Sequence, residues 1–366
     1  MLGDLQKQMF DDALIQASSA PIEPQVHPLE LTMPVKAYAA HSQGQRLEPH
    51  TFEFGALGAN EVEINVSHCG ICHSDVHLID NDWGLSSYPL TPGHEAVGEV
   101  SAVGSAVKSL KRGSRVGVGW LAGSCMACES CLEGHVNTCA GWQPTCVGRP
   151  GAFADKLRVD HRFAFELPKE LSSDEAGPLM CGGATMFTPL EDNDVRDGTR
   201  VGVVSVGGLG HLGVQFAHAR GCKVTAFSTS PAKEAESREM GASDFAVLTD
   251  PDAMAARAGS LDFLLTTTPT DLPWDSLLGL LRPRGALCIL GIPASAVQFQ
   301  AFPLLAGNKR ILGSNTGSLS GIKSMLHTAA KKGVRPLIER HAMADVNTAI
   351  DRVRKNQVRY RAVLVA

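Results

Sequence analysis

Hydrophobic and polar positions divide the chain into two parts with different patterns. From Val35 to about residue 180, short apolar stretches alternate with Gly-rich turns, which is typical of a β-rich domain. Between about residues 199 and 315, nearly continuous apolar runs alternate with helix-like stretches. Such runs predict buried parallel strands with helices on both faces of the sheet. The six predicted strands are TRVGVVSV (199–206), CKVTAF (222–227), DFAVL (244–248), LDFLLT (261–266), GALCILG (285–291) and RILGS (310–314). The predicted fold class is α/β, with a β-rich domain and a doubly wound, six-stranded dinucleotide-binding domain.

The ends of the chain lie outside this alternation. Residues 1–33 show weak periodicity and contain the Pro-broken stretch SSAPIEPQVHP, so we interpret them as an N-terminal extension. They lack the basic and apolar regions of a secretory signal, and their aspartates disfavour a transit peptide. The tail ends on RYRAVLVA, a strand that we expect to return to the first domain. The predicted β-rich domain thus spans 34–181 and 319–366, and the dinucleotide-binding domain spans 182–318.

Composition limits the classes of function. The chain has 366 residues, 44% of them hydrophobic and 19% charged, which are values of a globular protein long enough for two cores. A net charge of −5 provides no basic surface for nucleic acid or an anionic membrane, and no apolar run reaches the length of a membrane span. We therefore expect a cytoplasmic protein in a reducing environment. Clustered cysteines there are more often metal ligands or catalytic groups than disulfides.

A Gly-rich loop follows the first predicted strand of the α/β part. In SVGGLGHLG, Ser205, Gly207 and Gly210 occupy the three glycine positions of the G-x-G-x-x-G pattern. The second glycine lets the backbone approach a pyrophosphate, and the third allows close helix–strand packing. Because Ser205 replaces the first glycine, the loop alone could be an ordinary turn between a strand and a helix. Its place among six alternating strands favours dinucleotide binding.

Four cysteines are concentrated in GSCMACESCLEGHVNTC, with the spacing C-x2-C-x2-C-x7-C. The alternatives are a disulfide knot, an iron–sulfur cluster, a metal-bound loop and four unrelated buried thiols. A ferredoxin-like cluster places its fourth cysteine three residues after the third and before proline, whereas here the gap is seven residues and Ala140 follows. Four thiolates on one short loop suit tetrahedral zinc in a closed structural site, so catalysis is expected elsewhere. The predicted ligands of the structural zinc are Cys125, Cys128, Cys131 and Cys139.

A second set of potential ligands is dispersed over three motifs. CGICHSDVH (69–77), PGHEAVGEV (92–100) and MCGG (180–183) each place cysteine or histidine beside glycine. A single buried cysteine or histidine is more often a packing residue than a ligand. Three such motifs in one chain are harder to explain by packing alone. Two thiolates and one imidazole around zinc form a known open catalytic site, which can polarise a carbonyl group and exchange substrate for water.

In these motifs the chain resembles the zinc-dependent medium-chain alcohol dehydrogenases. The resemblance is strongest to the cinnamyl alcohol dehydrogenase branch, including its bacterial aldehyde reductases. The shared motifs occur in order over about residues 35–366 and are CGICHSDVH, WGLSSYPLTPGHEAVGEV, the four-cysteine loop, LMCGGATMFTPL, GVVSVGGLGHLG, FSTSPAK and LGSNTGS. The resemblance implies a GroES-like catalytic domain with a structural-zinc lobe, a Rossmann domain, two zinc ions per chain and a homodimer. Two departures are Ser205 in the loop and the triplet SNT (314–316), where the family often has S-F-I or S-M-I.

The resemblance also implies which residues surround the catalytic zinc. Cys72 rather than Cys69 would be a ligand, together with His94 and Cys181, and Glu95 would be an occasional fourth ligand. The remaining cysteines (Cys69, Cys146, Cys222 and Cys288) are interpreted as small buried hydrophobic residues.

Further roles follow from the same resemblance. Ser74 would begin a proton relay that runs through the cofactor ribose to His77, and His73 would approach the pyrophosphate. Asp75 would orient the zinc ligands, as carboxylates commonly do for metal-bound histidine. Trp120 is either plain core or a wall of the substrate pocket. The predicted cofactor-binding residues are His73, Thr185, Gly207, Gly208, Leu209, Gly210, Ser228, Thr229, Ser230, Lys233, Thr267, Gly291, Ser314, Asn315 and Thr316.

The end of the second predicted strand indicates which nicotinamide cofactor is used. NAD-specific sites commonly place an acidic residue there, which binds the ribose 2′-hydroxyl. In this chain the strand is followed by Ser228, Thr229 and Ser230, then by Lys233. The other interpretation is a capped helix with a solvated lysine. The absence of an acidic residue and the presence of Lys233 together predict NADP(H), because hydroxyls, a helix N-terminus and a cation all favour a 2′-phosphate. Members of the resembling family carry S-S-S-x-x-K at this place, which also favours NADP(H).

The resulting hypothesis is an enzyme, a zinc- and NADP(H)-dependent alcohol dehydrogenase or aldehyde reductase. Its small-molecule partners would be primary alcohols and aldehydes, whether aromatic, cinnamyl or aliphatic, with zinc as the Lewis acid. One alternative is reduction of an iminium or an activated alkene on the same scaffold, since a fold does not fix a reaction. Another is a non-catalytic NADP(H)-binding protein, which would not need an open zinc site.

Overall fold

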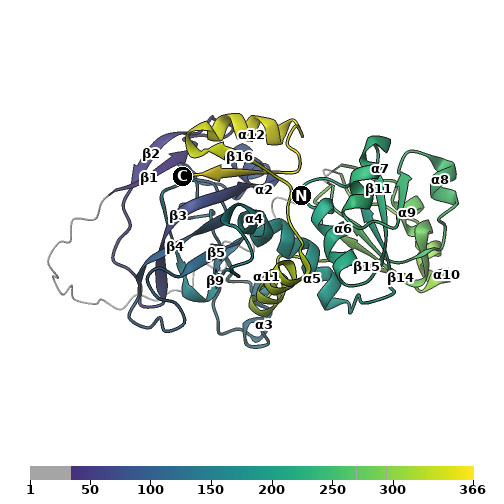
Figure 1. Cartoon of the computed structure of the whole chain (residues 1–366), viewed down its shortest axis with the longest axis horizontal. Helices are drawn as coiled ribbons and strands as arrows, with labels where there is room; N and C mark the ends of the chain where they lie inside the picture. The colour runs from purple at the N-terminus through teal and green to yellow at the C-terminus, as the bar shows by residue number, and fades with distance from the viewer. Residues whose placement is uncertain (1–33, 269, 294) are drawn as a thin grey trace.

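The computed structural model describes residues 34–268, 270–293 and 295–366. The predicted N-terminal extension, residues 1–33, lies outside these ranges. Figure 1 shows the β-rich part on one side of the molecule and a six-stranded sheet flanked by helices on the other. None of the helices in the described ranges has the length and hydrophobicity of a membrane-spanning segment.

The six-stranded sheet is entirely parallel, with the strand order β12-β11-β10-β13-β14-β15. Its strands are β10 (Arg200–Val204), β11 (Lys223–Ser228), β12 (Asp244–Val247), β13 (Leu261–Thr266), β14 (Leu281–Ile289) and β15 (Arg310–Gly313). The associated helices are α5 (Ala184–Asp192), α6 (Gly210–Ala219), α7 (Glu234–Glu239), α8 (Pro251–Ala255), α9 (Trp274–Leu280), α10 (Ala301–Gly307) and α11 (Leu319–Lys332). All six strands overlap the predicted apolar runs, and their order is that of a doubly wound dinucleotide-binding sheet, so the predicted fold class is confirmed.

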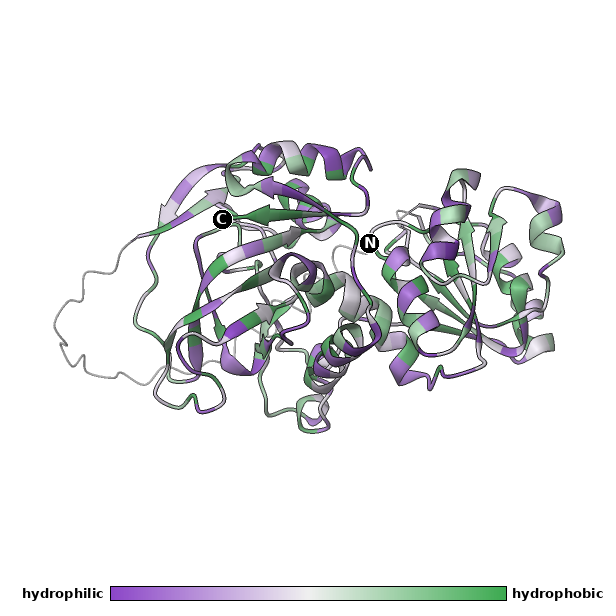
Figure 2. Ribbon diagram, in the orientation of Figure 1, coloured by the Kyte–Doolittle hydropathy of each residue, from purple (hydrophilic) through white to green (hydrophobic). Residues whose placement is uncertain are grey.

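Both faces of this sheet are buried, which explains why its strands are almost continuously apolar. Val201 and Val203 of β10 lie in a core with α5, α6 and α11, whereas Val204 lies in a separate core with α8 and α9. Each fully buried side chain of this size contributes roughly 1.5–3 kcal/mol of transfer free energy. Figure 2 shows the same arrangement as hydrophobic colour along the strands and a mixture of hydrophilic and hydrophobic colours on the helices that cover them.

The β-rich part contains a seven-stranded, mainly antiparallel sheet in the order β16-β17-β3-β4-β5-β9, with β8 paired to β3. Its strands are β3 (Glu61–Ile71), β4 (Glu95–Val103), β5 (Arg115–Val118), β8 (Lys156–Asp160), β9 (Ala164–Glu166), β16 (Ile338–Ala342) and β17 (Arg361–Val365). Two small sheets pair β1 (Val35–Ala39) with β2 (Glu48–Phe52), and β6 (Leu121–Gly123) with β7 (Gln143–Pro144). The helices are α2 (His73–Asp80), α3 (Glu129–Leu132), α4 (Ser173–Pro178) and α12 (Val346–Arg354).

The last strand, β17, pairs antiparallel with β3, so the expected return of the tail to the first domain is confirmed. This pairing places Ala362 opposite Ile71, directly before the predicted ligand Cys72. The predicted domain boundaries after residues 181 and 318 stay a prediction. Met325 and Leu326 of α11 share a core with Val201 of the six-stranded sheet, so the connection after β15 packs against both parts of the chain.

Candidate active site and metal centres

The first candidate ligand lies where a strand changes directly into a helix. β3 ends at Ile71, Cys72 follows, and α2 begins at His73. Asp75, in the first turn of α2, accepts a hydrogen bond from the backbone N–H of Cys72 at 2.8 Å through Oδ2. This contact satisfies a donor at the helix start, as an N-terminal cap does, and turns the Asp75 carboxylate inward.

The second oxygen of Asp75 fixes the orientation of His94. Asp75 Oδ1 accepts hydrogen bonds from the backbone N–H of Gly93 at 3.0 Å and from His94 Nδ1–H at 2.9 Å. Both side chains are fully buried. The contact assigns the proton to Nδ1 and leaves the Nε2 lone pair available for a metal, as neighbouring carboxylates do for metal-binding histidines.

Four predicted ligands converge on one buried point. The ligand atoms of Cys72, His94, Glu95 and Cys181 all lie within 4.8 Å of one another. His94 Nε2 and Glu95 Oε2 have no hydrogen-bond partner, although an unpaired buried polar atom costs about 1–3 kcal/mol. A cation between two thiolates and an imidazole removes that cost, and this donor set suits zinc in an open site. The residues present therefore fit a catalytic zinc ion.

Local backbone features place the last two of these ligands. Cys181 lies in a π-helical turn, Leu179–Gly183, between α4 and α5, a distortion often found at functional sites. Glu95 lies opposite Gly70 on the neighbouring strand, and a Cβ at Gly70 would collide with the Glu95 carboxylate. Glycine at position 70 thus makes room for a buried acid behind the ligand cluster.

Hydrogen bonds, burial and neighbouring charges shift the pKa values of the cluster. A hydrogen bond with Cys181 lowers the pKa of the Cys72 thiol, and the same contact raises the pKa of the Cys181 thiol. Burial raises the pKa of Glu95 to about 7, against the opposing pull of the Arg361 guanidinium. Arg361 forms an ion pair with Glu95, and both side chains are almost completely buried.

The four clustered cysteines also come together, around the short helix α3. Cys125, Cys128, Cys131 and Cys139 have their sulfur atoms within 4.8 Å of one another. Cys125 Sγ lies 3.9 Å from Cys131 Sγ and 3.4 Å from Cys139 Sγ. Tetrahedral zinc with bonds of about 2.3 Å requires sulfur–sulfur distances of about 3.8 Å. Backbone N–H groups lower the pKa of the Cys125 thiol to about 6, which favours the thiolate. All ten cysteines are free, which excludes the disulfide alternative.

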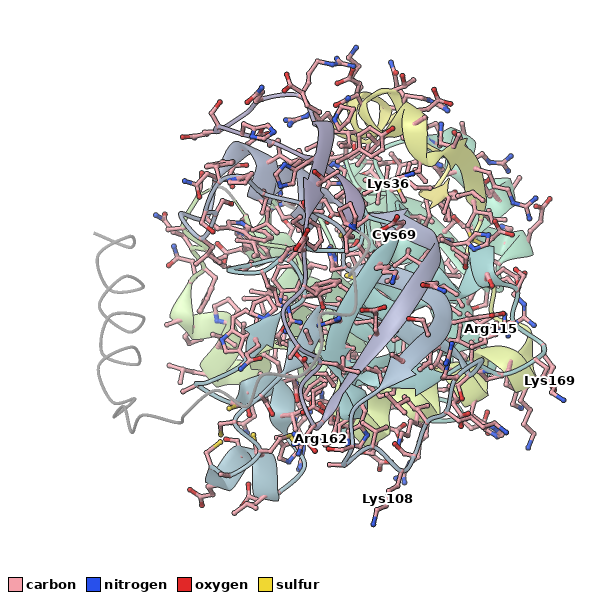
Figure 3. The ribbon with its side chains drawn as sticks, turned by 90° about the vertical axis from the view of Figure 1, so that its left-hand side faces the viewer. Lys36, Cys69, Lys108, Arg115, Arg162 and Lys169 are labelled. Atoms are coloured by element: carbon pink, nitrogen blue, oxygen red, sulfur yellow. The ribbon has the colours of Figure 1, made fainter. Side chains whose placement is uncertain are left out.

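Two other cysteines are close to the first cluster without belonging to it. Cys69 is fully buried on β3, and burial raises its pKa well above the usual value. Figure 3 shows Cys69 within the sheet, whereas Lys108 and Lys169 project into solvent. Cys146 Sγ lies within 4.8 Å of Asp75 and His94, but the groups of those two residues are already bonded to each other. Both thiols are packing residues, as expected.

A cleft of about 900 Å³ runs from the end of β3 to the loops of the six-stranded sheet. Seven of the predicted cofactor residues line it: His73, Gly207, Gly208, Ser228, Thr229, Ser230 and Lys233. The others lie outside this lining: Thr185, Leu209, Gly210, Thr267, Gly291, Ser314, Asn315 and Thr316. The cleft follows the carboxyl ends of parallel strands, where dinucleotides bind in open α/β sheets.

The Gly-rich loop keeps the backbone conformation of a glycine at its first position, although Ser205 stands there. Ser205, which replaces the first glycine, has a positive φ of 73°, an uncommon conformation for a residue with a side chain. A Cβ at Gly210 would collide with the carbonyl oxygen of Ser205, so only glycine fits this helix start. The Thr267 hydroxyl lies 3.0 Å from the carbonyl oxygens of Val204 and Ser205. Thr267 therefore supports the loop from behind and does not line the cleft.

The end of β11 places hydroxyls and a cation in the cleft. Ser228 Oγ accepts a hydrogen bond from the backbone N–H of Ser230 at 3.2 Å. In place of the helix N-terminus expected after β11, the chain forms a 3₁₀ turn, Pro231–Lys233, followed by the six-residue α7. Helix-dipole support for an anion is therefore weaker than expected. Lys233 Nζ lies 3.4 Å from Glu236 Oε2 and 4.0 Å from the centroid of the Tyr360 ring.

Two residues that form polar contacts beside the ligand clusters are among the cleft residues that the prediction missed. Arg361 and Tyr360 line the cleft, and both belong to the tail that returns to β3. The available signal was a pair of arginines around Tyr360, directly before an apolar strand. The strand was predictable, but the partner strand that brings these side chains to the cleft was not.

The predicted relay residues lie on α2. Ser74 Oγ is 3.6 Å from Cys72 Sγ, and the His77 ring bonds Asp82 Oδ2 through Nδ1 at 2.7 Å. His73 and His77 have ring centroids 6.4 Å apart. The relay itself stays a prediction.

Aromatic side chains form a wall beside the catalytic cluster. The Trp120 ring lies 5.0 Å from the His94 ring and 6.2 Å from that of Trp83. Trp83 in turn lies 5.1 Å from His77. Trp120 therefore borders the ligand cluster itself, which favours the interpretation of this residue as a pocket wall.

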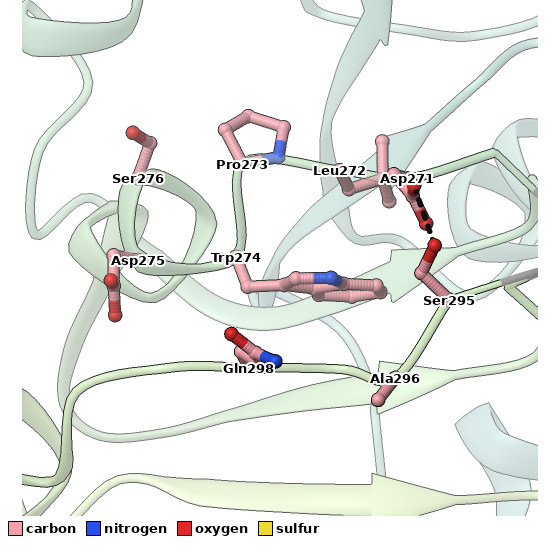
Figure 4. A pocket seen from close by; sticks show the side chains of 9 residues that line it. All are labelled: Asp271, Leu272, Pro273, Trp274, Asp275, Ser276, Ser295, Ala296 and Gln298. Atoms are coloured by element: carbon pink, nitrogen blue, oxygen red, sulfur yellow. Dashed lines mark hydrogen bonds between the residues drawn. The ribbon is translucent and has the colours of Figure 1, made fainter.

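A shallower depression of about 540 Å³ adjoins the cleft and shares Asp271, Leu272 and Pro273 with it. Figure 4 shows the Trp274 side chain among the lining residues and the hydrogen bond from Ser295 Oγ to Asp271 Oδ2, which measures 3.0 Å. Its lining contains neither cysteine nor histidine. The chemistry therefore belongs to the cleft that borders the Cys72 cluster.

Two family models match the chain. Residues 58–169 match the alcohol dehydrogenase GroES-like domain, and residues 208–339 match the zinc-binding dehydrogenase family. The aldehyde reductase AdhA of Synechocystis is 41% identical over 330 residues, which cover 90% of this chain and 98% of the relative. The 8-hydroxygeraniol dehydrogenase of Catharanthus roseus is 42% identical over 346 residues, covering 92% and 96%.

Solved structures agree with these matches. A cinnamyl alcohol dehydrogenase from Sorghum bicolor superposes with a TM-score of 0.88 at 39% identity, covering 91% of this chain and 98% of that structure. A cinnamyl alcohol dehydrogenase from Helicobacter pylori, solved in complex with NADP(H), has a TM-score of 0.85 at 30% identity, with coverage of 92% and 99%.

Proposed function

Because the chain belongs to the zinc-dependent medium-chain alcohol dehydrogenases, we propose that it interconverts primary alcohols and aldehydes with NADP(H) as the cofactor. One observation carries this proposal. The buried set Cys72, His94 and Cys181 leaves His94 Nε2 without a partner, and its neighbours His73 and Arg361 line the cofactor cleft. A non-catalytic nucleotide-binding protein has no need for three convergent metal ligands beside its cleft.

The roles of the individual residues follow from this geometry. When bound, zinc supplies a Lewis acid for the carbonyl oxygen, and NADPH supplies the hydride. Cys72, His94 and Cys181 hold the ion, and Asp75 keeps His94 in the tautomer that can bind. The two thiolates balance the charge of the ion, so a neutral aldehyde can enter without a large charge change. Arg361 keeps Glu95 buried behind the cluster.

We propose that protons leave and enter through α2. Ser74, beside Cys72, is placed to pass a proton toward the cofactor ribose, and His77 would exchange it with solvent. Partial exposure of the His77 side chain and its contact with Asp82 support this role.

The cofactor proposal rests on the phosphate-binding groups at the end of β11. Ser228, Thr229 and Ser230 offer hydroxyls, and Lys233 offers a full positive charge, with no carboxylate at the strand end. Hydrogen bonds to charged groups contribute about 1.5–3 kcal/mol, so Lys233→Ala should weaken NADPH binding roughly ten- to hundredfold. NADH lacks the phosphate, so its binding should change little.

A screen of aromatic, cinnamyl and aliphatic aldehydes tests the activity, with NADPH oxidation as the readout. Consumption of NADPH with at least one class, and slower consumption of NADH, is expected. An active preparation that reduces iminium or activated-alkene substrates but no aldehyde would favour the alternative reaction on this scaffold.

We also propose two zinc ions per chain, a cytoplasmic location and a homodimer. The two separate ligand clusters support the zinc count. Large hydrophobic side chains exposed between residues 292 and 305, directly before the edge strand β15, support association of two copies. These side chains are Ile292, Phe299, Phe302 and Leu305. Light scattering of the purified protein distinguishes a dimer from a monomer or a tetramer.

A further inference from the structure

A carboxylate lies beside the cation that is proposed to hold the 2′-phosphate. Glu236, on α7, has its Oε2 atom 3.4 Å from Lys233 Nζ, and its side chain is only 15% exposed. A carboxylate in this position competes with a phosphate for the ammonium group, because each anion lowers the charge available to the other. Glu236 thus competes with the proposed 2′-phosphate for Lys233.

That competitor is bound by two other donors. Arg359 Nε donates a hydrogen bond to Glu236 Oε1 at 2.7 Å, and the Tyr360 hydroxyl donates to Oε2. Burial raises the pKa of Glu236, but the hydrogen bonds from Tyr360 and Arg359 outweigh it, so the net pKa is lowered and the carboxylate is charged. Among these contacts the Lys233 one is the longest, which leaves the ammonium group the most weakly engaged partner.

The Tyr360 ring is itself held in place. Lys233 Nζ lies 4.0 Å from its centroid, a cation–π distance, and the ring stacks on His211 with centroids 4.7 Å apart and planes 10° apart. His211 is fixed by Gly207 and Leu337: its Nδ1 donates to the Gly207 carbonyl at 3.1 Å, and its Nε2 accepts from the Leu337 N–H at 3.3 Å. Tyr360 therefore cannot turn away from Glu236 without breaking this stack.

We propose that Arg359 and Tyr360 determine cofactor specificity by keeping Glu236 from neutralising Lys233. The inference rests on the proposed function, in which Lys233 binds the 2′-phosphate of NADP(H). Lys233 and Arg359 carry two positive charges against one negative charge on Glu236, so the cluster keeps a surplus of one positive charge for the phosphate. Both positioning residues precede β17, which belongs to the seven-stranded sheet. Cofactor choice is thus set in part from outside the sheet that binds the nucleotide.

Two single variants test the inference on the holoenzyme. Tyr360→Phe keeps the ring on His211 and under Lys233 but removes the hydroxyl, so Glu236 turns to Lys233. Arg359→Gln removes the other donor, and its side chain is 68% exposed, so folding is preserved. In both variants the ratio of Kd for NADPH to Kd for NADH, measured by fluorescence titration, should rise about three- to tenfold, since hydrogen bonds to charged groups have that weight or more.

A rescue experiment separates this role from a structural one. Adding Glu236→Gln to Tyr360→Phe removes the competing charge, so the Kd ratio should return to within about twofold of the wild-type value. Glu234→Gln is the matched control, because Glu234 lies on the same helix and pairs with Arg238 away from the cluster. This control should leave the ratio of Tyr360→Phe high.

The possible results distinguish a failure of this inference from a failure of the proposed function. A wild-type preference for NADPH with an unchanged ratio in both single variants would overturn the inference and leave the proposed function standing. A raised ratio that Glu236→Gln does not restore would also overturn it, because Tyr360 would then act through general packing. Wild-type protein that binds NADH as tightly as NADPH would overturn the cofactor proposal and the inference with it.

Discussion

His211 is a titratable ring that the native protein holds without its proton, so acid should unfold this chain more readily than a variant without that ring. The imidazole is fully buried against Tyr360, and both of its nitrogens are used by Gly207 and Leu337. Because Nε2 accepts a hydrogen bond from a backbone N–H, a proton there would break that contact. Burial, with a contribution from the nearby Arg361 charge, lowers the pKa of His211 from 6.5 to about 3.

The size of the effect follows from this shift. Above pH 6.5 the ring is neutral in both the folded and the unfolded chain, and its contribution to stability is complete. Below pH 6.5 the unfolded chain binds the proton first, so the free energy of unfolding falls as the pH falls, down to about pH 3. At 1.36 kcal/mol per pH unit, the loss between pH 7 and pH 5 is about 2 kcal/mol.

His211→Phe is the informative variant, because phenylalanine can stack on Tyr360 but carries no charge. At pH 7 it should be less stable than the wild type by about 1–3 kcal/mol, since a carbonyl and an N–H lose their partner. At pH 5 that gap should shrink by about 2 kcal/mol.

Urea unfolding at both pH values, followed by tryptophan fluorescence with zinc in excess, measures the difference in free energy of unfolding between the two proteins at each pH. Acid effects on the zinc ligands are common to both proteins and cancel in the difference. An equal gap at pH 7 and pH 5 would refute the assignment of a neutral, buried His211.

Three further substitutions separate the parts of the site. Cys128→Ser should remove one zinc ion per chain and lower the melting temperature, because a structural ion contributes folding energy. Leu132→Ala, on the exposed side of the same loop, is the control. An unchanged metal content in Cys128→Ser would exclude the assignment. His77→Ala should lower turnover by at most about 10²–10⁴-fold and change the pH–rate profile, whereas an unaltered profile would remove His77 from the relay. Gly210→Ala should weaken binding of both nicotinamide cofactors, because the new Cβ meets the carbonyl oxygen of Ser205; binding at wild-type strength would show that the loop can relax.

Much of the fold was predictable because buried parallel strands have an unmistakable pattern. β10 alternates between two cores on opposite faces of the sheet, so neither face tolerates polar residues and the apolar run is continuous. The zinc clusters were predictable for different reasons. The four cysteines of the loop are close in sequence, so spacing alone indicates the site. The set Cys72, His94 and Cys181 came from the family resemblance, and the structure brings these residues together.

The missed residues depend on contacts that sequence spacing does not contain. Arg361 reaches Glu95 across 266 positions, and only the pairing of β17 with β3 determines that approach. The same pairing brings Tyr360 onto His211 and Lys233. Local pattern predicted the last strand, but the choice of its neighbour is a property of the whole sheet.

The helix expected after β11 shows a limit of capping signals. Ser230 and Pro231 are a proper helix start, yet the chain forms a 3₁₀ turn before the short α7. Propensity describes the first turn, whereas Glu236 of α7 bonds Arg359 and Tyr360, which precede β17, and local sequence does not contain these contacts.

Zinc content measured together with aldehyde reduction, in wild type and in Cys72→Ser, tests the proposed mechanism most directly. Wild-type protein should contain two zinc ions per chain and oxidise NADPH in the presence of an aldehyde. Cys72→Ser should keep the structural ion and a nearly unchanged melting temperature, because an open site adds less to stability than a closed one, and should lose turnover. Turnover at the wild-type rate by Cys72→Ser with a single zinc ion per chain would contradict zinc catalysis at the Cys72, His94 and Cys181 cluster.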